Sequence, residues 1–275
     1  MNTKVINNYA KVGPNLLSIP LVLLSLIFFF LFKKNALSVE GYINIQKNWF
    51  FYINSELSQF PEITYNLTQF GDSLIFLSFL SILIIYTPKM WEALVYSCLC
   101  SLVFSSTLKN LFSVPRPAAA LDQQSFFIIG KTLTGHNSLP SGHSITVFTV
   151  LTVLLFSFMP EKNKAKFFWI IAIILTGAIL VSTRVGVGAH FPLDVTIGSI
   201  LGFLAGLLGI LISKKVKLFN WISNKKSYPF FILLFLTCSI VLVGKIIKEN
   251  LVTYYLSLVC LLFTLYKITY VYFKK

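Results

Sequence analysis

The chain has 275 residues, of which 56% are hydrophobic and 12% are charged, and its mean hydropathy is +0.79. Soluble domains carry roughly 25% charged residues, so this composition excludes an ordinary soluble domain and indicates several membrane-spanning helices. The net charge of +14 does not indicate nucleic-acid binding, because the lysines gather in short loops between apolar runs and no nucleic-acid-binding motif accompanies them.

The first apolar run predicts a membrane-spanning helix. It covers residues 15–32 and ends at Lys33-Lys34 without a small-residue cleavage site, so we expect an uncleaved helix rather than a signal peptide. The mixed segment 35–63 gathers aromatic residues at positions 49–52. Such residues concentrate at the membrane–water interface, and the segment is expected either to lie at that interface or to form an aromatic-rich loop.

Seven further apolar runs follow. They predict helices over about residues 64–87, 90–113, 140–159, 167–184, 192–212, 229–246 and 251–271. Pro192 suits the first turn of its helix, where the missing N–H has no intrahelical partner. The fold class is therefore all-α, a polytopic transmembrane bundle with eight spans.

Lysine positions predict the orientation of the bundle. If the N terminus is cytoplasmic, Lys89 and the lysine-rich loops 162–166 and 214–226 all lie in the cytoplasm. Cytoplasmic loops are enriched in Lys and Arg, so both termini are expected inside.

Three polar clusters remain once these loops are accounted for. They are Lys109 to Arg116-Pro117, Pro140-Ser141-Gly142-His143, and Arg184 through His190 to Asp194. Counting the spans places all three on the non-cytoplasmic side, so one composite site is expected there.

Cationic groups in these clusters indicate a phosphate site. Arg116 and Arg184 are the two arginines among 23 basic residues, and a guanidinium presents a planar fork of donors that matches phosphate oxygens. Lys109 adds a third positive charge. Ser141 can donate a hydroxyl and Gly142 allows close approach of the backbone, at a helix N-terminus that favours anions.

The remaining groups indicate acid–base and nucleophilic chemistry. His190 and Asp194 are four residues apart, close enough for the carboxylate to orient the imidazole and raise its nucleophilicity. His143 can act as a general acid. Two histidines and an aspartate also suit a metal ion, but the neighbouring cations would repel one. Helix caps and loop pairs are the non-functional alternative.

The three clusters together resemble the motifs of the type 2 phosphatidic acid phosphatase superfamily. The matching patterns are Lys109-x6-Arg116-Pro117, Pro140-Ser141-Gly142-His143 and Ser182-x-Arg184-x5-His190-x3-Asp194. The resemblance spans about residues 64–212 and implies a six-helix phosphatase core. A membrane phosphatase domain over 1–212 is therefore expected. A second part, 213–275, holds a basic cytoplasmic loop and a C-terminal transmembrane hairpin that matches no catalytic motif.

The resemblance also implies a role for each site residue. In that family the histidine at the position of His190 attacks phosphorus to form a phosphohistidine, the aspartate matching Asp194 orients it, and the histidine matching His143 protonates the leaving group. The phosphate-binding positions correspond to Lys109, Arg116, Ser141, Gly142 and Arg184. No metal and no other cofactor is used.

A lipid phosphatase of a bacterial inner membrane, with its site facing the periplasm or the cell exterior, is the function expected. Its partner is a phosphorylated membrane lipid within the bilayer: undecaprenyl pyrophosphate, phosphatidylglycerol phosphate, phosphatidic acid or lipid A. Two alternatives remain open, a phosphotransferase that uses the same phosphohistidine and a non-catalytic transporter of lipid phosphates. The sequence predicts no oligomeric state.

Three smaller expectations concern single positions. Asp72 falls inside the second predicted span, where an unpaired carboxylate is expensive, so we expect it to pair with Lys109 or Arg116, the alternative being the edge of a water-filled pocket. His136 is expected to be a surface loop residue rather than a substrate contact. Gly198, Gly202 and Gly206 recur every four residues and predict close helix packing.

Overall fold

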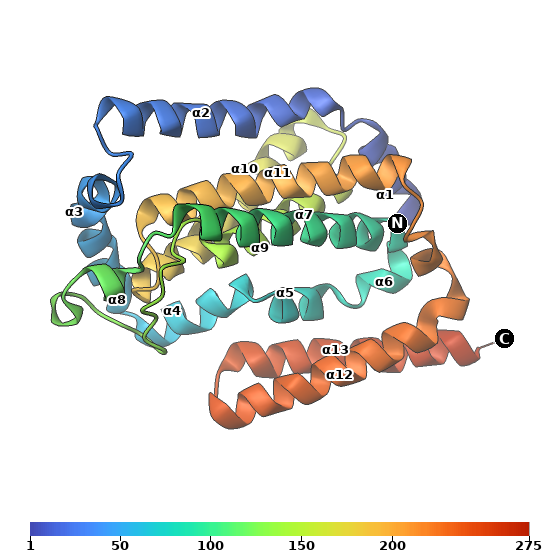
Figure 1. The fold of residues 1–275 in the computed structure, drawn as a ribbon. Helices are drawn as coiled ribbons and strands as arrows, with labels where there is room; N and C mark the ends of the chain where they lie inside the picture. Colours follow the sequence, from blue (N-terminus) through green and yellow to red (C-terminus); the bar gives the residue numbers. More distant parts are fainter. Residues whose placement is uncertain (275) are drawn as a thin grey trace.

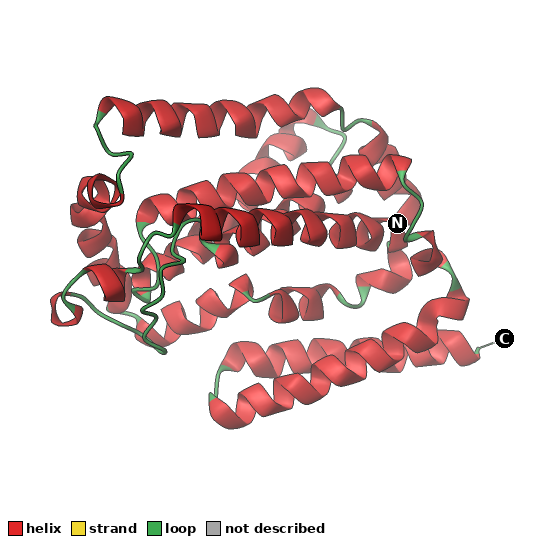
Figure 2. Ribbon diagram, in the orientation of Figure 1, coloured by secondary structure: helices red, strands yellow, loops and turns green. Residues whose placement is uncertain are grey.

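The computed structural model describes residues 1–274, and within that range it is helical with no β-strand (Figures 1 and 2). Its long helices are α2 (Ser18–Lys33), α3 (Val39–Ser58), α7 (Pro88–Phe112), α9 (Gly142–Ser157), α10 (Asn163–Gly186), α11 (Pro192–Lys215), α12 (Tyr228–Lys248) and α13 (Val252–Phe273). The short helices are α1 (Asn2–Ala10), α4 (Pro61–Thr68), α5 (Ser73–Leu80), α6 (Leu83–Tyr86) and α8 (Pro117–Ala120), and the 3-10 turns are η1 (Pro14–Leu17), η2 (Gln69–Gly71), η3 (Gln123–Ser125), η4 (Asn220–Ser223) and η5 (Lys225–Ser227). The all-α prediction is confirmed.

Six helical stretches in the described residues are long and apolar enough to cross a membrane, so the chain is a multi-pass membrane protein. They are Pro14–Lys33, Pro88–Ala120, Asn163–Gly186, Pro192–Lys215, Lys225–Lys248 and Val252–Phe273. The shorter α9 and the interrupted stretch α4–α6 also run along the bundle beside these six (Figure 1). The eight segments that run along the bundle are called crossings below. The N terminus and the end of α13 accordingly lie at the same end of the bundle.

The second crossing is not the continuous helix predicted over 64–87. Residues 69–72 interrupt it, and α5 starts afresh with Asp72 as its N-cap, whose Oδ1 accepts a hydrogen bond of 2.9 Å from the N–H of Leu74. An aspartate side chain competes for backbone N–H groups in this way and favours a cap over a helix interior. The apolar run 64–87 therefore contains a helix break that its hydropathy did not predict.

The centre of the bundle is α11, which packs against α7 and α9. Small residues allow these helices to approach closely: a Cβ at Gly198 would lie 2.7 Å from the carbonyl oxygen of Ser141, and one at Gly206 would lie 2.5 Å from Cβ of Thr152. The close packing predicted from the glycine spacing is confirmed. It joins the N-terminal ends of α9 and α11 to one another.

Segment 35–63 forms α3, which lies across one end of the bundle (Figure 1). Ser38 caps it by accepting a 3.1 Å hydrogen bond from the N–H of Gly41. Phe50 is fully buried, and its ring packs edge-on against Phe126 and Phe191. The segment is therefore a packed helix and not a loop. It covers the end of the bundle at which the long loop 113–141 also lies.

The C-terminal hairpin α12–α13 packs on the interrupted crossing, with α13 against α4 and α5. Its helix bounds agree closely with the predicted 229–246 and 251–271. Much of its outward surface is apolar, as at Leu233, Ile240 and Ile247, which suits contact with lipid. The division at residue 212 stays a prediction.

Candidate functional site

The three polar clusters meet at the end of the bundle covered by α3. Lys109 lies in the last turn of α7, and the backbone N–H of Ser141 donates to the carbonyl oxygen of Asp194 at 3.0 Å. A Cβ at Gly142 would lie 3.2 Å from Lys109 Nζ. Arg116 Nη1 lies 3.4 Å from His190 Nε2. The structure therefore confirms that the three clusters lie together at one end of the bundle.

A tight turn after α10 delivers His190 to this site. Gly188 adopts φ +75°, the left-handed region that favours glycine. A Cβ there would also meet the carbonyl oxygen of Phe127 at 2.7 Å. The N–H of Ala189 then donates to the carbonyl oxygen of Arg184 at 3.0 Å, which closes the end of α10 and fixes the position of the next residue.

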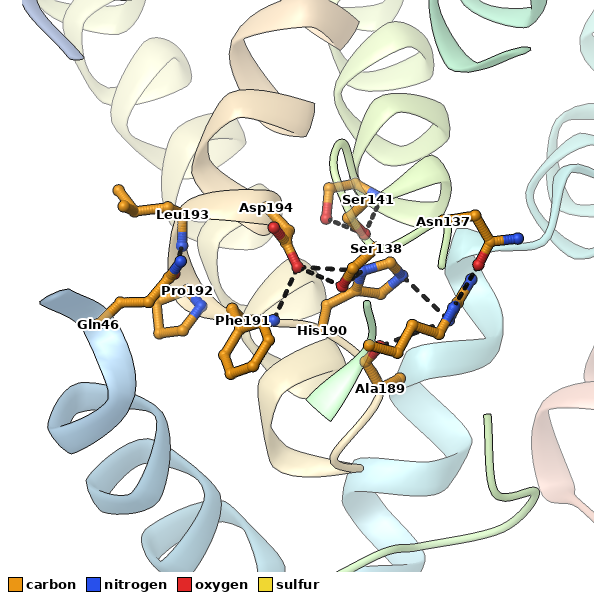
Figure 3. A network of polar contacts seen from close by, with 12 residues as sticks. Gln46, Asn137, Ser138, Ser141, Ala189, His190, Phe191, Pro192, Leu193 and Asp194 are labelled. Atoms are coloured by element: carbon orange, nitrogen blue, oxygen red, sulfur yellow. Dashed lines mark hydrogen bonds and ion pairs between the residues drawn. The ribbon is translucent and has the colours of Figure 1, made fainter. Parts of the chain in front are cut away.

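His190 and Asp194 are both fully buried and face one another (Figure 3). His190 Nδ1 lies 3.6 Å from Asp194 Oδ2, which is longer than a hydrogen bond. Ser138 contacts both partners, because its Oγ donates to Asp194 Oδ2 at 2.5 Å and lies 3.4 Å from His190 Nδ1. In this structure a serine thus links the predicted histidine–aspartate pair.

Two further donors hold the Asp194 carboxylate. Tyr42 Oη of α3 donates to Oδ1 at 2.8 Å, and the backbone N–H of Phe191 donates to Oδ2 at 2.9 Å. A buried carboxylate needs such donors to remain charged. Tyr42 and Ser138 were both missed from the sequence. Ser138 lies just before the Pro140 motif and could have been suspected, whereas nothing in the pattern of segment 35–63 marked Tyr42.

The surroundings of His190 keep its ring neutral. Burial lowers the pKa of His190 well below its ordinary 6.5, and the positive charges of Arg116, Arg184 and Lys109 lower it further. A neutral imidazole with its proton on Nδ1, toward Asp194, directs the lone pair of Nε2 toward Arg116, whose Nη1 lies 3.4 Å away.

The two arginines are buried, and neither forms an ion pair within the described residues. Arg116 Nε donates to Asn137 Oδ1 at 2.8 Å (Figure 3), and Arg184 Nη1 donates to Thr68 Oγ1 at 2.9 Å. Arg184 Nε is buried without any hydrogen-bond partner. Buried cations without an anion are costly, so the arrangement is suited to receive an anionic group.

His143 lies in the first turn of α9 and faces a cleft of about 450 Å3 between α5, α7 and α9. Polar residues such as Ser105, His143 and Thr146 and apolar residues such as Leu102 and Ile145 line the cleft together. The cleft therefore extends from His143 between these three helices.

Ser141 is fully buried and caps α9, where its Oγ accepts hydrogen bonds from the N–H and the hydroxyl of Ser144, at 3.4 and 2.9 Å. Its predicted contact with phosphate stays a prediction. His136 is exposed in the loop, as expected.

The expected partner of Asp72 was wrong. Asp72 Oδ2 forms an ion pair of 2.6 Å with Lys245 of α12, and not with Lys109 or Arg116. The two partners are 173 residues apart in the chain, and nothing in the sequence placed the C-terminal hairpin beside the second crossing. Asp72 also lines the cleft, in agreement with the alternative of a pocket edge.

Comparison with known proteins identifies the family. The model of the PAP2 superfamily matches residues 90–218. An undecaprenyl-diphosphatase of Sulfolobus acidocaldarius is 31% identical over 149 residues, which are 53% of this chain and 67% of the relative. The crystal structure of Aquifex aeolicus LpxE is similar with a TM-score of 0.50 and 27% identity, over 62% of this chain and 96% of that one. The chain belongs to the PAP2 superfamily. It is an enzyme of the phosphatase class, embedded in a membrane.

Proposed function

We propose that the chain hydrolyses a phosphate or diphosphate group of a membrane lipid through a phosphohistidine on His190. The observation that carries this proposal is the buried His190 beside Arg116 and Arg184, two buried cations that form no ion pair within the described residues. A phosphate bound there would pair with both arginines and bring phosphorus to His190 Nε2, with Arg116 Nη1 turning from the ring nitrogen to a phosphate oxygen.

The proposed reaction has two displacements at phosphorus. In the first, His190 Nε2 forms a bond to phosphorus while the bond to the lipid oxygen breaks, and protonated His143 gives its proton to that oxygen. In the second, water attacks phosphorus and loses a proton to His143, and the phosphorus–nitrogen bond breaks to release phosphate. Asp194 stabilises the imidazole while it carries the phosphoryl group.

Binding and charge stabilisation fall to the remaining groups. Lys109, Arg116 and Arg184 would hold the phosphate oxygens, together with Ser141 and the backbone at Gly142, as charge builds up in the transition state. We propose that no metal or other cofactor takes part, so a chelator is expected to leave the rate unchanged.

A lipid substrate is favoured by the cleft beside His143. The cleft is lined by His143 at the site and extends between α5, α7 and α9, so a headgroup could enter while its chains remain in the bilayer. The Sulfolobus relative, an undecaprenyl-diphosphatase, makes undecaprenyl diphosphate the first substrate to test, ahead of phosphatidylglycerol phosphate, phosphatidic acid and lipid A. We propose a bacterial inner membrane with the site on the outer face.

The test is phosphate release from these four lipids in detergent micelles, comparing the wild type with His190→Ala. His136→Ala is the matched control, because His136 is an exposed histidine at the same end of the bundle. We expect release by the wild type and the control and none by His190→Ala. Full turnover by His190→Ala would contradict the proposal. Labelled phosphate recovered on a second lipid would favour the phosphotransferase alternative, and binding without turnover the transporter.

A further inference from the structure

The C-terminal hairpin contacts the part of the second crossing that lies against the site. It is absent from the family match, which ends at residue 218. The turn between α12 and α13 lies at the same end of the bundle as α3 (Figure 1). We define the break as Thr68, the last residue of α4, together with residues 69–72, which interrupt the second crossing before α5.

The break touches two site residues directly. The backbone of Gly71 lies so close to His143 that a Cβ on it would be 2.6 Å from Cγ of the ring. Thr68 accepts the 2.9 Å hydrogen bond from Arg184 Nη1. The position of the break therefore determines where the His143 ring and the Arg184 guanidinium can lie.

Two residues of the hairpin hold the break from outside. Lys245 Nζ binds Asp72 Oδ2 at 2.6 Å, and Tyr254 Oη donates to Gln69 Oε1 at 3.0 Å. Lys245 Nζ also lies over the Tyr254 ring, 5.4 Å from its centroid. These contacts hold Gln69 and Asp72, the first and last residues of the interruption. Each contact joins residues more than 170 positions apart in the chain.

Further polar contacts fasten the same two elements on either side of the break. Thr253 donates from N and Oγ1 to Oδ1 and the carbonyl oxygen of Asn66, at 3.1 and 3.0 Å. Deeper in the bundle, the buried hydroxyls of Ser81 and Thr264 form a 2.6 Å hydrogen bond. In an apolar environment such bonds have few competing partners, so α13 fixes the register of the interrupted crossing.

We propose that the C-terminal hairpin is a positioning element of the active site. Through Lys245 and Tyr254 it holds the break against His143 and Arg184 and keeps the general acid and the phosphate ligand in place. This inference rests on the proposed function, and it assigns a role to a part of the chain outside the family match. Lys245 and Tyr254 act through the break and are positioning residues rather than catalytic ones.

The test is steady-state phosphate release by Lys245→Met, Asp72→Asn and the double variant, with the thermal midpoint of each measured in detergent. Misplacement of a catalytic group by about 1 Å can cost about 100-fold in rate. Losing one of the contacts that hold the break is expected to displace His143 by less than this, and therefore to lower kcat about tenfold. KM is expected to change less than kcat. Because the two residues act as one pair, the double variant is expected to be no slower than the single ones.

Three further variants make the result decisive. Lys245→Arg keeps the charge and is expected to keep most of kcat. Tyr254→Phe removes the hydroxyl that bonds Gln69 in the break and Glu249 at the end of α12, at 3.0 and 3.2 Å. It is expected to lower kcat without changing the ion pair between Lys245 and Asp72. Lys267→Met on α13 is the control, because Lys267 contacts the rings of Phe263 and Tyr266 and no residue of the break.

Each remaining outcome overturns a definite statement. Wild-type kcat in Lys245→Met and Tyr254→Phe would contradict the positioning role while the phosphatase proposal stands. A change in KM alone would also contradict it, because it would indicate contact with the substrate. A lower thermal midpoint at unchanged kcat would show that the hairpin stabilises the fold without positioning the active site. A wild type inactive on every lipid would contradict the proposed function itself, and this inference with it.

Discussion

At the scale of single residues, the electrostatics of His190 determine when the site can work. Arg116, Arg184 and Lys109 all act to lower the pKa of the ring, and burial acts in the same direction. The same cations that would bind phosphate thus also act to keep His190, the proposed nucleophile, unprotonated. Asp194 lies 3.6 Å from His190 Nδ1 and is itself held by Ser138, Tyr42 and the backbone.

The first prediction concerns pH. Because the folded-state pKa of His190 lies well below 6.5, the loss of kcat/KM caused by its protonation should occur below pH 6.5. The same pKa shift affects the free energy of unfolding. As pH falls through 6.5, the histidine of the unfolded chain takes up a proton before that of the folded chain, so the folded chain loses stability toward acid. A pH profile of kcat/KM checks this, and a limb centred at or above pH 6.5 that is absent from kcat would contradict it.

The second prediction concerns Ser138. Ser138→Ala removes the 2.5 Å hydrogen bond to Asp194, and a bond to a charged group contributes about 1.5–3 kcal/mol. We expect kcat to fall at least about tenfold with a smaller change in KM, since the serine contacts the proposed catalytic pair, His190 and Asp194, and does not line the cleft. Ser106→Ala, an exposed serine bonded to its own helix, is the control. Equal kcat in both variants would show that the serine link is dispensable.

At the scale of elements, the break in the second crossing brings backbone against His143 where a continuous helix would not. The third prediction follows from Gly71. Gly71→Ala introduces a Cβ into the His143 ring, so we expect a loss of kcat of about tenfold or more and a destabilisation of about 1–3 kcal/mol. Gly244→Ala is the control, because a Cβ there has nothing within 4 Å. Phosphate release and thermal unfolding of both variants check it. Unchanged kcat in Gly71→Ala would mean that His143 can move freely.

The sequence predicted the elements that apolar length alone determines. For α7, predicted over 90–113 and found over Pro88–Phe112, and for the C-terminal hairpin, the bounds agree closely. The break at Asp72 was missed because the helix was predicted from the apolar character of the whole run 64–87, in which a single capping carboxylate has little weight. The motif residues were identified because they are rare polar groups, whereas Tyr42 and Lys245 depend on tertiary contacts between elements far apart in the chain.

At the scale of the whole molecule, eight crossings place the lysine-rich loops at one end and the site at the other. Lys164 and Lys166 follow α9 at the end opposite His190, and Lys214 and Lys215 end α11 there. Positively charged loops face the cytoplasm, which supports the proposal that the site lies outside.

The fourth prediction tests this orientation. We expect His136→Cys, exposed at the site end, to react with a membrane-impermeant thiol reagent on intact cells. Lys164→Cys at the opposite end should react only after the membrane is permeabilised. The unsubstituted chain is the control, since its four cysteines lie half-buried within helices. The reverse pattern of labelling would place the site in the cytoplasm.

The most direct test of the central claim is to trap the enzyme during turnover with a lipid that carries a radiolabelled terminal phosphate. A phosphoryl group on histidine is lost in acid and retained in alkali. We predict a labelled chain with this behaviour, with the label mapping to His190 in wild type and absent from His190→Ala. Label that remains in His190→Ala, or wild-type turnover without any labelled chain, would contradict the phosphohistidine mechanism.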